Sequence, residues 1–228
     1  MPIYNAPLLN IDAKETRRYA GLMKAKNFDE RMIESACQDA MLLASPKGSW
    51  LIYDYDCHTQ TIKADPPFTI TGTKIGQHLA GCDKVVMLAA TVGETIEDTV
   101  SKRFADGNYT DSVLLDAAAT AAVEQIADSM EKTIKQKTAP MGYGMRWRFS
   151  PGYGDWPLED QLDMIRLTEA YKIGLSLSTS LMLIPRKSIT AIIGLYKETT
   201  SQAKEKTNHT TKGCANCNKL DCPARKLS

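Results

Sequence analysis

The chain has 228 residues and a formal net charge of +1, and 43% of its residues are hydrophobic. This length fits one large domain or two small ones, and the hydrophobic share is enough for a buried core. The near-neutral balance gives no reason to expect nucleic acid as a partner, because such partners call for a basic surface.

The first residues and the apolar runs favour a cytoplasmic protein. MPIYNAPLLNID lacks the basic start and the apolar core of a signal peptide. The longest wholly apolar run, VVMLAA, is far shorter than the roughly 20 residues of a membrane span. We therefore expect no membrane partner, and the six cysteines fit a reducing compartment as thiols or ligands.

The first part of the chain predicts helices followed by two strands. Apolar residues recur at helical spacing over residues 10–44, and Cys37 lies on that stripe, where it would pack as a small hydrophobe. SWLIYDYD is typical of a strand. A second short strand, FTIT, follows the turn at residues 65–67.

The middle of the chain predicts a strand, a turn and two helices. Residues 85–90 form a buried strand, and a glycine turn leads into a helix that begins near Glu94. Such a helix start can bind an anion, although a tight turn alone explains the glycine as well. A long helix is predicted from Asp111 to Gln136, with small residues on its buried face.

The last third predicts further strands and one helix. YGMRWRF reads as a strand and LEDQLDMIRLTEAYKIG as a helix, whose buried face would carry Leu158, Leu162, Ile165 and Leu167. SLMLIP and SITAIIGLYK are predicted to complete the core as two strands around a turn from Pro185 to Ser188.

This mixture of helices and strands without strict alternation predicts an α+β fold. We expect a single mixed or antiparallel sheet covered by helices. Residues 1–198 would form one domain that includes the N-terminal helices 10–44. Residues 199–228, where the composition turns polar, would form a linker and a Cys-rich tail.

The stretch RFSPGYGDWPLEDQ has the residue types of a small-molecule site. Arg148 offers a planar fork of donors that suits a carboxylate. Pro151 limits the backbone, while Gly152 and Gly154 would let a ligand approach the main chain. The chemistry therefore suits a ligand that carries a carboxylate.

The aromatic and acidic residues of the same stretch extend this interpretation. Tyr153 and Trp156 supply flat walls, and Asp155 and Glu159 could hold hydroxyls or a cation. A zwitterion with a sugar and a flat ring would fit. A purely structural loop, with Arg148 in an internal ion pair, explains the same residues equally well.

RFSPGYGDWP resembles the motif Arg-x-x-x-Gly-Tyr-x-x-x-Pro of the S-adenosylmethionine-binding activation domain of cobalamin-dependent methionine synthase. The residues on the motif positions are Arg148, Gly152, Tyr153 and Pro157. SLMLIPRKSITAIIGLY is similar to that domain's Met-x-Pro-x-x-Ser-(Val/Ile)-(Ser/Thr)-Gly segment, which places Ser188 on the serine position. The resemblance covers roughly residues 85–197.

The resemblance implies a role in reactivating cobalamin. In the family, cobalamin that has oxidised to Co(II) is rescued by one electron and a methyl group from S-adenosylmethionine, and the protein supplies alignment without a nucleophile or other catalytic residue of its own. The implied partners are a cobalamin-carrying methionine synthase and a flavodoxin-type or other electron donor. The implied ligand-binding residues are Arg148, Pro151, Gly152, Tyr153, Gly154, Glu94, Asp155 and Ser188.

Two departures from the family shape this expectation. The family has an acidic residue a few positions before the motif arginine, which MGYGM lacks, so Glu94 or Asp155 would take its role. The chain is also too short for homocysteine, folate and cobalamin modules. We therefore expect a stand-alone reactivation subunit; the alternatives are a non-catalytic S-adenosylmethionine-binding or corrinoid-protein docking module, and an iron–sulfur or zinc adaptor.

The segment CANCNKLDC near the C-terminus is a candidate metal site. It holds, within nine residues, Cys214, Cys217 and Cys222. Basic neighbours favour thiolates, which bind zinc or an iron–sulfur cluster, with His209 or a cysteine of another chain as fourth ligand. A redox disulfide and an inert tail remain alternatives. His78 is expected to be an ordinary surface or core histidine.

Overall fold

The computed structural model describes residues 3–5 and 8–198, and an antiparallel sheet forms the middle of this part of the chain. Seven strands belong to this sheet in the described residues, in the order β4-β3-β2-β5-β9-β6, with β1 paired to β2. They are β1 (Ile3–Tyr4), β2 (Lys47–Asp56), β3 (Thr61–Ile62), β4 (Phe68–Thr69), β5 (Lys84–Thr91), β6 (Tyr143–Met145) and β9 (Ser188–Lys197).

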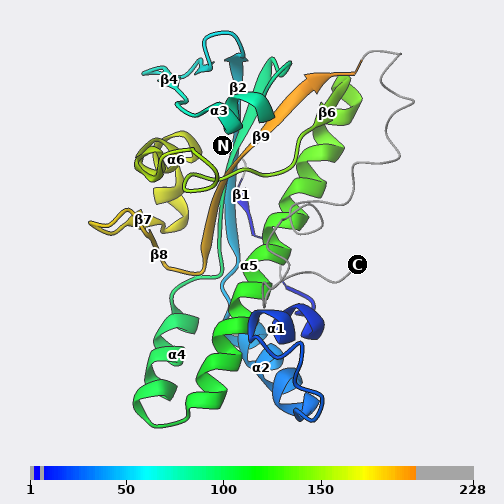
Figure 1. Cartoon of the computed structure of the whole chain (residues 1–228), viewed down its shortest axis with the longest axis vertical. Helices are drawn as coiled ribbons and strands as arrows, with labels where there is room; N and C mark the ends of the chain where they lie inside the picture. Colours follow the sequence, from blue (N-terminus) through cyan, green and yellow to red (C-terminus); the bar gives the residue numbers. More distant parts are fainter. Residues whose placement is uncertain (1–2, 6–7, 199–228) are drawn as a thin grey trace.

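Helices cover both faces of the sheet (Figure 1). The α-helices are α1 (Ala13–Tyr19), α2 (Glu30–Leu43), α3 (Thr73–His78), α4 (Thr95–Ala105), α5 (Tyr109–Thr138) and α6 (Gln161–Thr168). Short 3-10 helices are η1 (Ala139–Met141), η2 (Leu158–Asp160) and η3 (Ala170–Ile173). Figure 1 shows α5 along one side of the long strands and α6 along the other. The predicted α+β fold is therefore confirmed.

Alternating residues of β5 and β9 build two cores. Val86 and Leu88 face the layer of α1, α2, α4 and α5, whereas Val85 and Met87 face the layer of α3 and α6. Successive side chains of a strand point to opposite faces, so a central strand must be apolar throughout. Every residue of β5 from 85 to 91 is buried, as expected for the run VVMLAA.

Small residues let α5 lie close to the sheet. Ala118, Ala119 and Ala122 of α5 are fully buried. A Cβ atom on Gly48 of β2 would lie 2.4 Å from Sδ of Met130, which belongs to α5. The helix therefore leaves no room for a side chain at position 48. The prediction of a long helix with a small-residue face that another element approaches closely is confirmed.

The N-terminal region and its core cysteine agree with expectation. Residues 10–44 contain two helices, α1 and α2, as predicted. The buried residues of α2 are Ile33, Ala36, Cys37 and Ala40. Cys37 is 6% exposed, which confirms that it packs as a core residue.

No helix among residues 3–5 and 8–198 is both long and apolar enough to cross a bilayer.

The predicted helix over residues 158–174 is broken, and its predicted buried face is wrong at Leu162 but right at Leu167. Leu162 is 60% exposed, while Met164 and Leu167 are buried. Residues 158–160 form a 3-10 turn, whose tighter winding shifts the phase of the α-helix that follows. Glu169 then ends α6 with a left-handed backbone, φ 50°.

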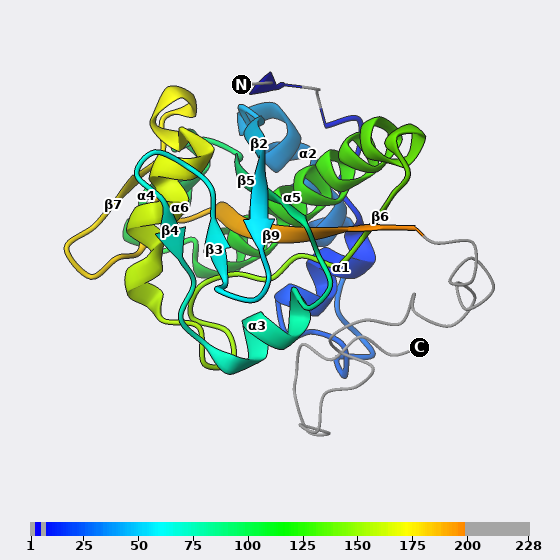
Figure 2. The ribbon, with the colours of Figure 1, turned by 90° about the horizontal axis from the view of Figure 1, so that it is seen from above.

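SLMLIP is not a core strand. Only Leu183–Ile184 is extended, as β8, and it pairs with β7 (Ser176–Leu177) in a separate two-stranded sheet. Figure 2 shows β7 at the side of the molecule away from β6. Met182 is 57% exposed and Ile184 45%, because so short a hairpin forms no buried face. The following strand, SITAIIGLYK, is β9 as predicted.

Candidate functional site

The loop after β6 continues along β9 through a bulge. Arg146 N donates to Gly194 O at 2.8 Å. Phe149 N donates to Ile192 O at 3.0 Å. The loop therefore advances by three residues, from 146 to 149, while β9 advances by two, from 194 to 192. An extra residue of this kind re-aims the side chains beside it. Arg148 points toward α5, whereas Phe149 packs into the core on the opposite face.

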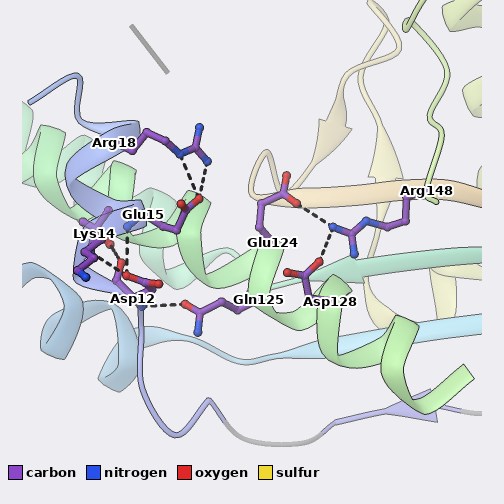
Figure 3. A network of polar contacts seen from close by, with 9 residues as sticks. Asp12, Lys14, Glu15, Arg18, Glu124, Gln125, Asp128 and Arg148 are labelled. Carbon is purple, nitrogen blue, oxygen red and sulfur yellow. Dashed lines mark hydrogen bonds and ion pairs between the residues drawn. The ribbon is translucent and has the colours of Figure 1, made fainter. Parts of the chain in front are cut away.

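The Arg148 guanidinium is held by acidic residues of α5 (Figure 3). Its Nη2 lies 3.1 Å from Glu124 Oε2 and 2.8 Å from Asp128 Oδ1. Its Nη1 lies 3.4 Å from Glu131 Oε1, but it is buried and makes no hydrogen bond within the described residues. The arginine is thus fixed in position and keeps one donor without a hydrogen-bond acceptor.

A cavity of about 270 Å³ opens beside this arginine. The residues that line it are Asp12, Glu15, Tyr19, Ala121, Glu124, Gln125, Asp128 and Arg148. Four of these are carboxylates and one is a guanidinium, so the cavity favours a ligand with more positive than negative charge. Burial raises the pKa of Tyr19, and the negative charge of Glu124 raises it further, which keeps the phenol neutral.

The start of α1 forms the far wall of the cavity. Asp12 caps this helix, because its Oδ1 accepts from Lys14 N at 2.8 Å and from Glu15 N at 3.2 Å. Asp12 N in turn donates to Gln125 Oε1 of α5 at 2.9 Å (Figure 3). The two walls of the cavity are therefore tied together, which gives it a defined shape.

A second cation binds the same face of α5. Lys187, directly before β9, places its Nζ 2.9 Å from Asp116 Oδ2 and 3.0 Å from Thr120 Oγ1. Residues four apart share one face of a helix. The polar stripe of α5 thus consists of Asp116, Thr120, Glu124 and Asp128. With a rise of 1.5 Å per residue this stripe is about 18 Å long, with Lys187 at one end and Arg148 at the other.

Two predicted site residues lie near the Lys187 end of this stripe. Ser188 follows Lys187 directly and donates from Oγ to Thr91 Oγ1 at 2.9 Å. Glu94 is the exposed N-cap residue of α4, and its side chain makes no capping hydrogen bond. The start of α4, which the glycine turn marks as a possible anion site, therefore has the acidic side chain of Glu94 beside it.

The loop over residues 146–157, called the motif loop below, contains two glycines. Both have a left-handed backbone that only glycine adopts readily. Gly152 has φ +87° and Gly154 has φ +64°. Gly152 N donates to Trp156 O at 2.9 Å, which closes the loop on itself. Pro151 is buried at its base, and Tyr153 at its tip is 68% exposed. Tyr153 is thus available to a partner or ligand.

Asp155 lies on the other side of the sheet from the Arg148 side chain. Its Oδ2 accepts from Thr73 N at 2.9 Å, and its Oδ1 from Lys74 N at 3.0 Å, at the start of α3. These bonds from Lys74 and Thr73 lower the pKa of Asp155. The structure therefore does not bring Asp155 to Arg148, and Trp156, 2% exposed, is a core residue rather than an open wall.

The carboxylates beside Arg148 were not predicted from the sequence. They come from α5, whereas the sequence predicts Glu94 or Asp155 in the missing acidic role. Glu124 and Asp128 are four residues apart in a helix rich in alanine, and this spacing is a usable signal. It indicates one acidic face but not which loop approaches it.

The predicted metal ligands Cys214, Cys217 and Cys222 lie outside the described residues, as does the predicted linker from residue 199. Within residues 3–5 and 8–198, no group of three or more His, Cys, Asp or Glu side chains is arranged to hold a metal ion. The metal site and the domain boundary after residue 198 stay predictions.

Comparison with known proteins identifies the fold. No family model matches the sequence, and no curated protein matches it significantly. Among solved structures, the crystal structure of the MetH reactivation domain bound to AdoHcy is similar, with a TM-score of 0.60. The match covers 88% of this chain and 80% of that chain at 12% sequence identity. The chain therefore has the fold of the MetH reactivation domain.

Proposed function

We propose that the protein binds S-adenosylmethionine beside Arg148 and acts as a stand-alone reactivation subunit for the cobalamin of a separate methionine synthase. The fold supports this proposal, because the similar reactivation domain was crystallised with AdoHcy, the demethylated form of the same ligand. The observation that carries it is the acidic cavity with one arginine, whose Nη1 donor has no hydrogen-bond partner in the described residues.

The charges of the cavity match those of the ligand. S-adenosylmethionine carries one carboxylate and two positive groups, the ammonium and the sulfonium. Arg148 would bind the carboxylate through Nη1 in a charge-assisted bond, for which Nη1 would have to turn from Glu131, 3.4 Å away, into the cavity. Glu124 and Asp128, at 3.1 Å and 2.8 Å from the guanidinium, would face the positive groups. The lining thus offers a counter-charge to each ionic group.

The size of the cavity suggests how the ligand would lie. A volume of about 270 Å³ is slightly below the ~300–1,000 Å³ of typical small-molecule pockets. We place the methionyl half inside the cavity, with the adenosyl half along the polar stripe of α5 toward Ser188. Gly152, Tyr153 and Gly154 would border the open side, where a corrinoid protein approaches.

The residues of this chain would bind and align. When bound, S-adenosylmethionine supplies a methyl group on a positively charged sulfur, which reduced cobalt of the partner protein can take. Arg148 fixes the carboxylate end, and the α5 carboxylates fix the sulfur between them. No proton has to move in this transfer, so the protein contributes alignment and effective concentration.

A reactivation assay tests the proposal. A methionine synthase truncated before its own reactivation domain, with its cobalamin in the Co(II) form, is mixed with this protein, a reductant and S-adenosylmethionine. The expected result is the absorption spectrum of methylcobalamin, formed with the parent protein and much more slowly with Arg148→Ala. Ligand binding without methyl transfer would leave only a binding module, and absence of ligand binding would overturn the proposal.

A further inference from the structure

Helix α3 contacts the motif loop at two points. At its start, the backbone N–H groups of Thr73 and Lys74 donate to the Asp155 carboxylate. At its end, His78 Nε2 lies 2.9 Å from Trp147 O. Trp147 and Asp155 bracket the whole segment that contains Arg148 and the two glycines. One helix of six residues thus holds both ends of the loop.

His78 is packed against the residues on either side of Arg148. Its ring lies 4.4 Å from the ring of Trp147 and 5.4 Å from that of Phe149, measured between centroids. It is 9% exposed. Because a carbonyl oxygen only accepts, Nε2 carries the proton and donates to Trp147 O. A buried histidine with this partner is more than a space-filling core residue.

The bond to Trp147 O fixes the backbone that leads into Arg148. Trp147 O and Arg148 N belong to one planar peptide unit, so holding the oxygen sets the orientation of the whole plane. The Arg148 side chain leaves from the next atom and reaches across to α5. A small rotation of this peptide would therefore displace the guanidinium from Asp128 and from the cavity.

The loop and α3 are closely fitted at the other end as well. A Cβ atom on Gly72, which precedes α3, would lie 3.2 Å from Asp155 O. A Cβ atom on Gly154 would lie 2.9 Å from Lys74 Cδ. The Asp155 bonds are therefore made in a tight interface, which resists sliding of the loop along the helix.

We propose that α3 is a clamp that sets the position of Arg148, with His78 and Asp155 as positioning residues. The inference rests on the proposed function where it concerns ligand affinity, because only a ligand makes the exact position of the guanidinium matter. Neither residue touches the cavity, so both act through the loop backbone.

Hydrogen exchange of the backbone amides tests the clamp without any ligand. His78→Ala and Asp155→Ala should speed exchange over residues 146–156 by about tenfold or more, while β5 and α5 keep the parental rates. His78→Gln, which retains an N–H donor at the place of Nε2, should restore part of the protection. His58→Ala, an exposed histidine in the turn after β2, is the matched control. Unchanged exchange in the loop would overturn the clamp.

Calorimetric titration with S-adenosylmethionine tests whether the clamp acts through Arg148. His78→Ala should weaken binding about tenfold in the parent but less than about twofold in the Arg148→Ala background, because coupled residues are not additive. Equal losses in both backgrounds would show general damage and overturn the positioning role. If His78→Ala does not fold, Asp155→Asn gives the same comparison. If the parent itself does not bind, the proposed function fails, and hydrogen exchange alone decides the clamp.

Discussion

Asp128 Oδ1 lies 2.8 Å from Arg148 Nη2, which joins the middle of α5 to the loop after β6. The sequence left two interpretations of Arg148 open, an internal ion pair and a ligand clamp. The structure combines them, because the paired arginine also lines a cavity and keeps a donor without a hydrogen-bond acceptor in the described residues. The ion pairs with Glu124 and Asp128 orient the guanidinium, and its Nη1, 3.4 Å from Glu131 Oε1, is the donor that still lacks a hydrogen bond in the described residues.

The α5 carboxylates should decide how well the protein distinguishes S-adenosylmethionine from AdoHcy. AdoHcy lacks the sulfonium charge, so Glu124→Gln and Asp128→Asn should each lower the preference for S-adenosylmethionine by about tenfold, equivalent to about 1.4 kcal/mol. Competition titrations of the two ligands measure this ratio. Asp39→Asn removes a carboxylate that pairs with Arg103 and does not line this cavity, so it serves as control. An unchanged ratio would mean that these carboxylates only hold Arg148.

Gly152 should matter for binding beyond its cost in stability. Its φ of +87° strains any other L-residue, so Gly152→Ala should cost roughly 1–2 kcal/mol of stability. Gly107 between α4 and α5 has φ +82° with open space around it, so Gly107→Ala is a matched control with the same strain. Thermal unfolding should show similar losses for both, whereas calorimetry should show weaker ligand binding only for Gly152→Ala. Parental affinity in that variant would make Gly152 a structural turn residue.

The stability of the fold should fall in mild acid because of His78. Burial lowers its pKa, the bond to Trp147 O opposes this, and the nearby Arg146 lowers it further. Below about pH 6.5 the unfolded chain therefore binds a proton that the folded protein resists, and stability declines as the pH falls toward the folded pKa.

Urea unfolding at about pH 7.5 and about pH 5.5 measures this effect. The parent should lose more stability between the two values than His78→Gln, because glutamine does not titrate. Every other titrating group is common to both proteins and cancels in the comparison. Parallel losses in the two proteins would show that His78 does not contribute to the pH dependence.

Most of the fold was predictable where one long element carries a clear pattern. The sequence correctly predicts the buried strand at residues 85–90, the small-residue face of α5 and the strand SITAIIGLYK, because each is a long element whose apolar residues follow from the layers that it packs against. α3 was missed, since its six residues are too few for a periodic signal. Leu162 is exposed although the sequence predicts it to be buried, because a 3-10 turn that the hydrophobic pattern does not indicate precedes α6.

The candidate site was only half predictable for a related reason. Arg148 was found through a local motif, but its partners Glu124 and Asp128 lie 24 and 20 residues earlier and meet it only in the folded chain. The sequence predicts Glu94 or Asp155 in the acidic role that the family motif implies. Asp155 instead accepts from the first backbone N–H groups of α3, because the loop turns toward that helix, on the other face of the sheet, before it reaches Asp155.

Calorimetric titration with S-adenosylmethionine tests the central claim most directly, with Arg148→Ala beside the parent. Losing one charge-assisted bond costs about 1.5–3 kcal/mol, so the variant should bind roughly 10- to 150-fold more weakly. Arg103→Ala, which removes a paired arginine from the α2–α4 side, should bind as the parent does. Saturable binding by the parent with this loss in Arg148→Ala is the predicted result. Equal affinity of Arg148→Ala and the parent, or no binding by the parent, would contradict the claim.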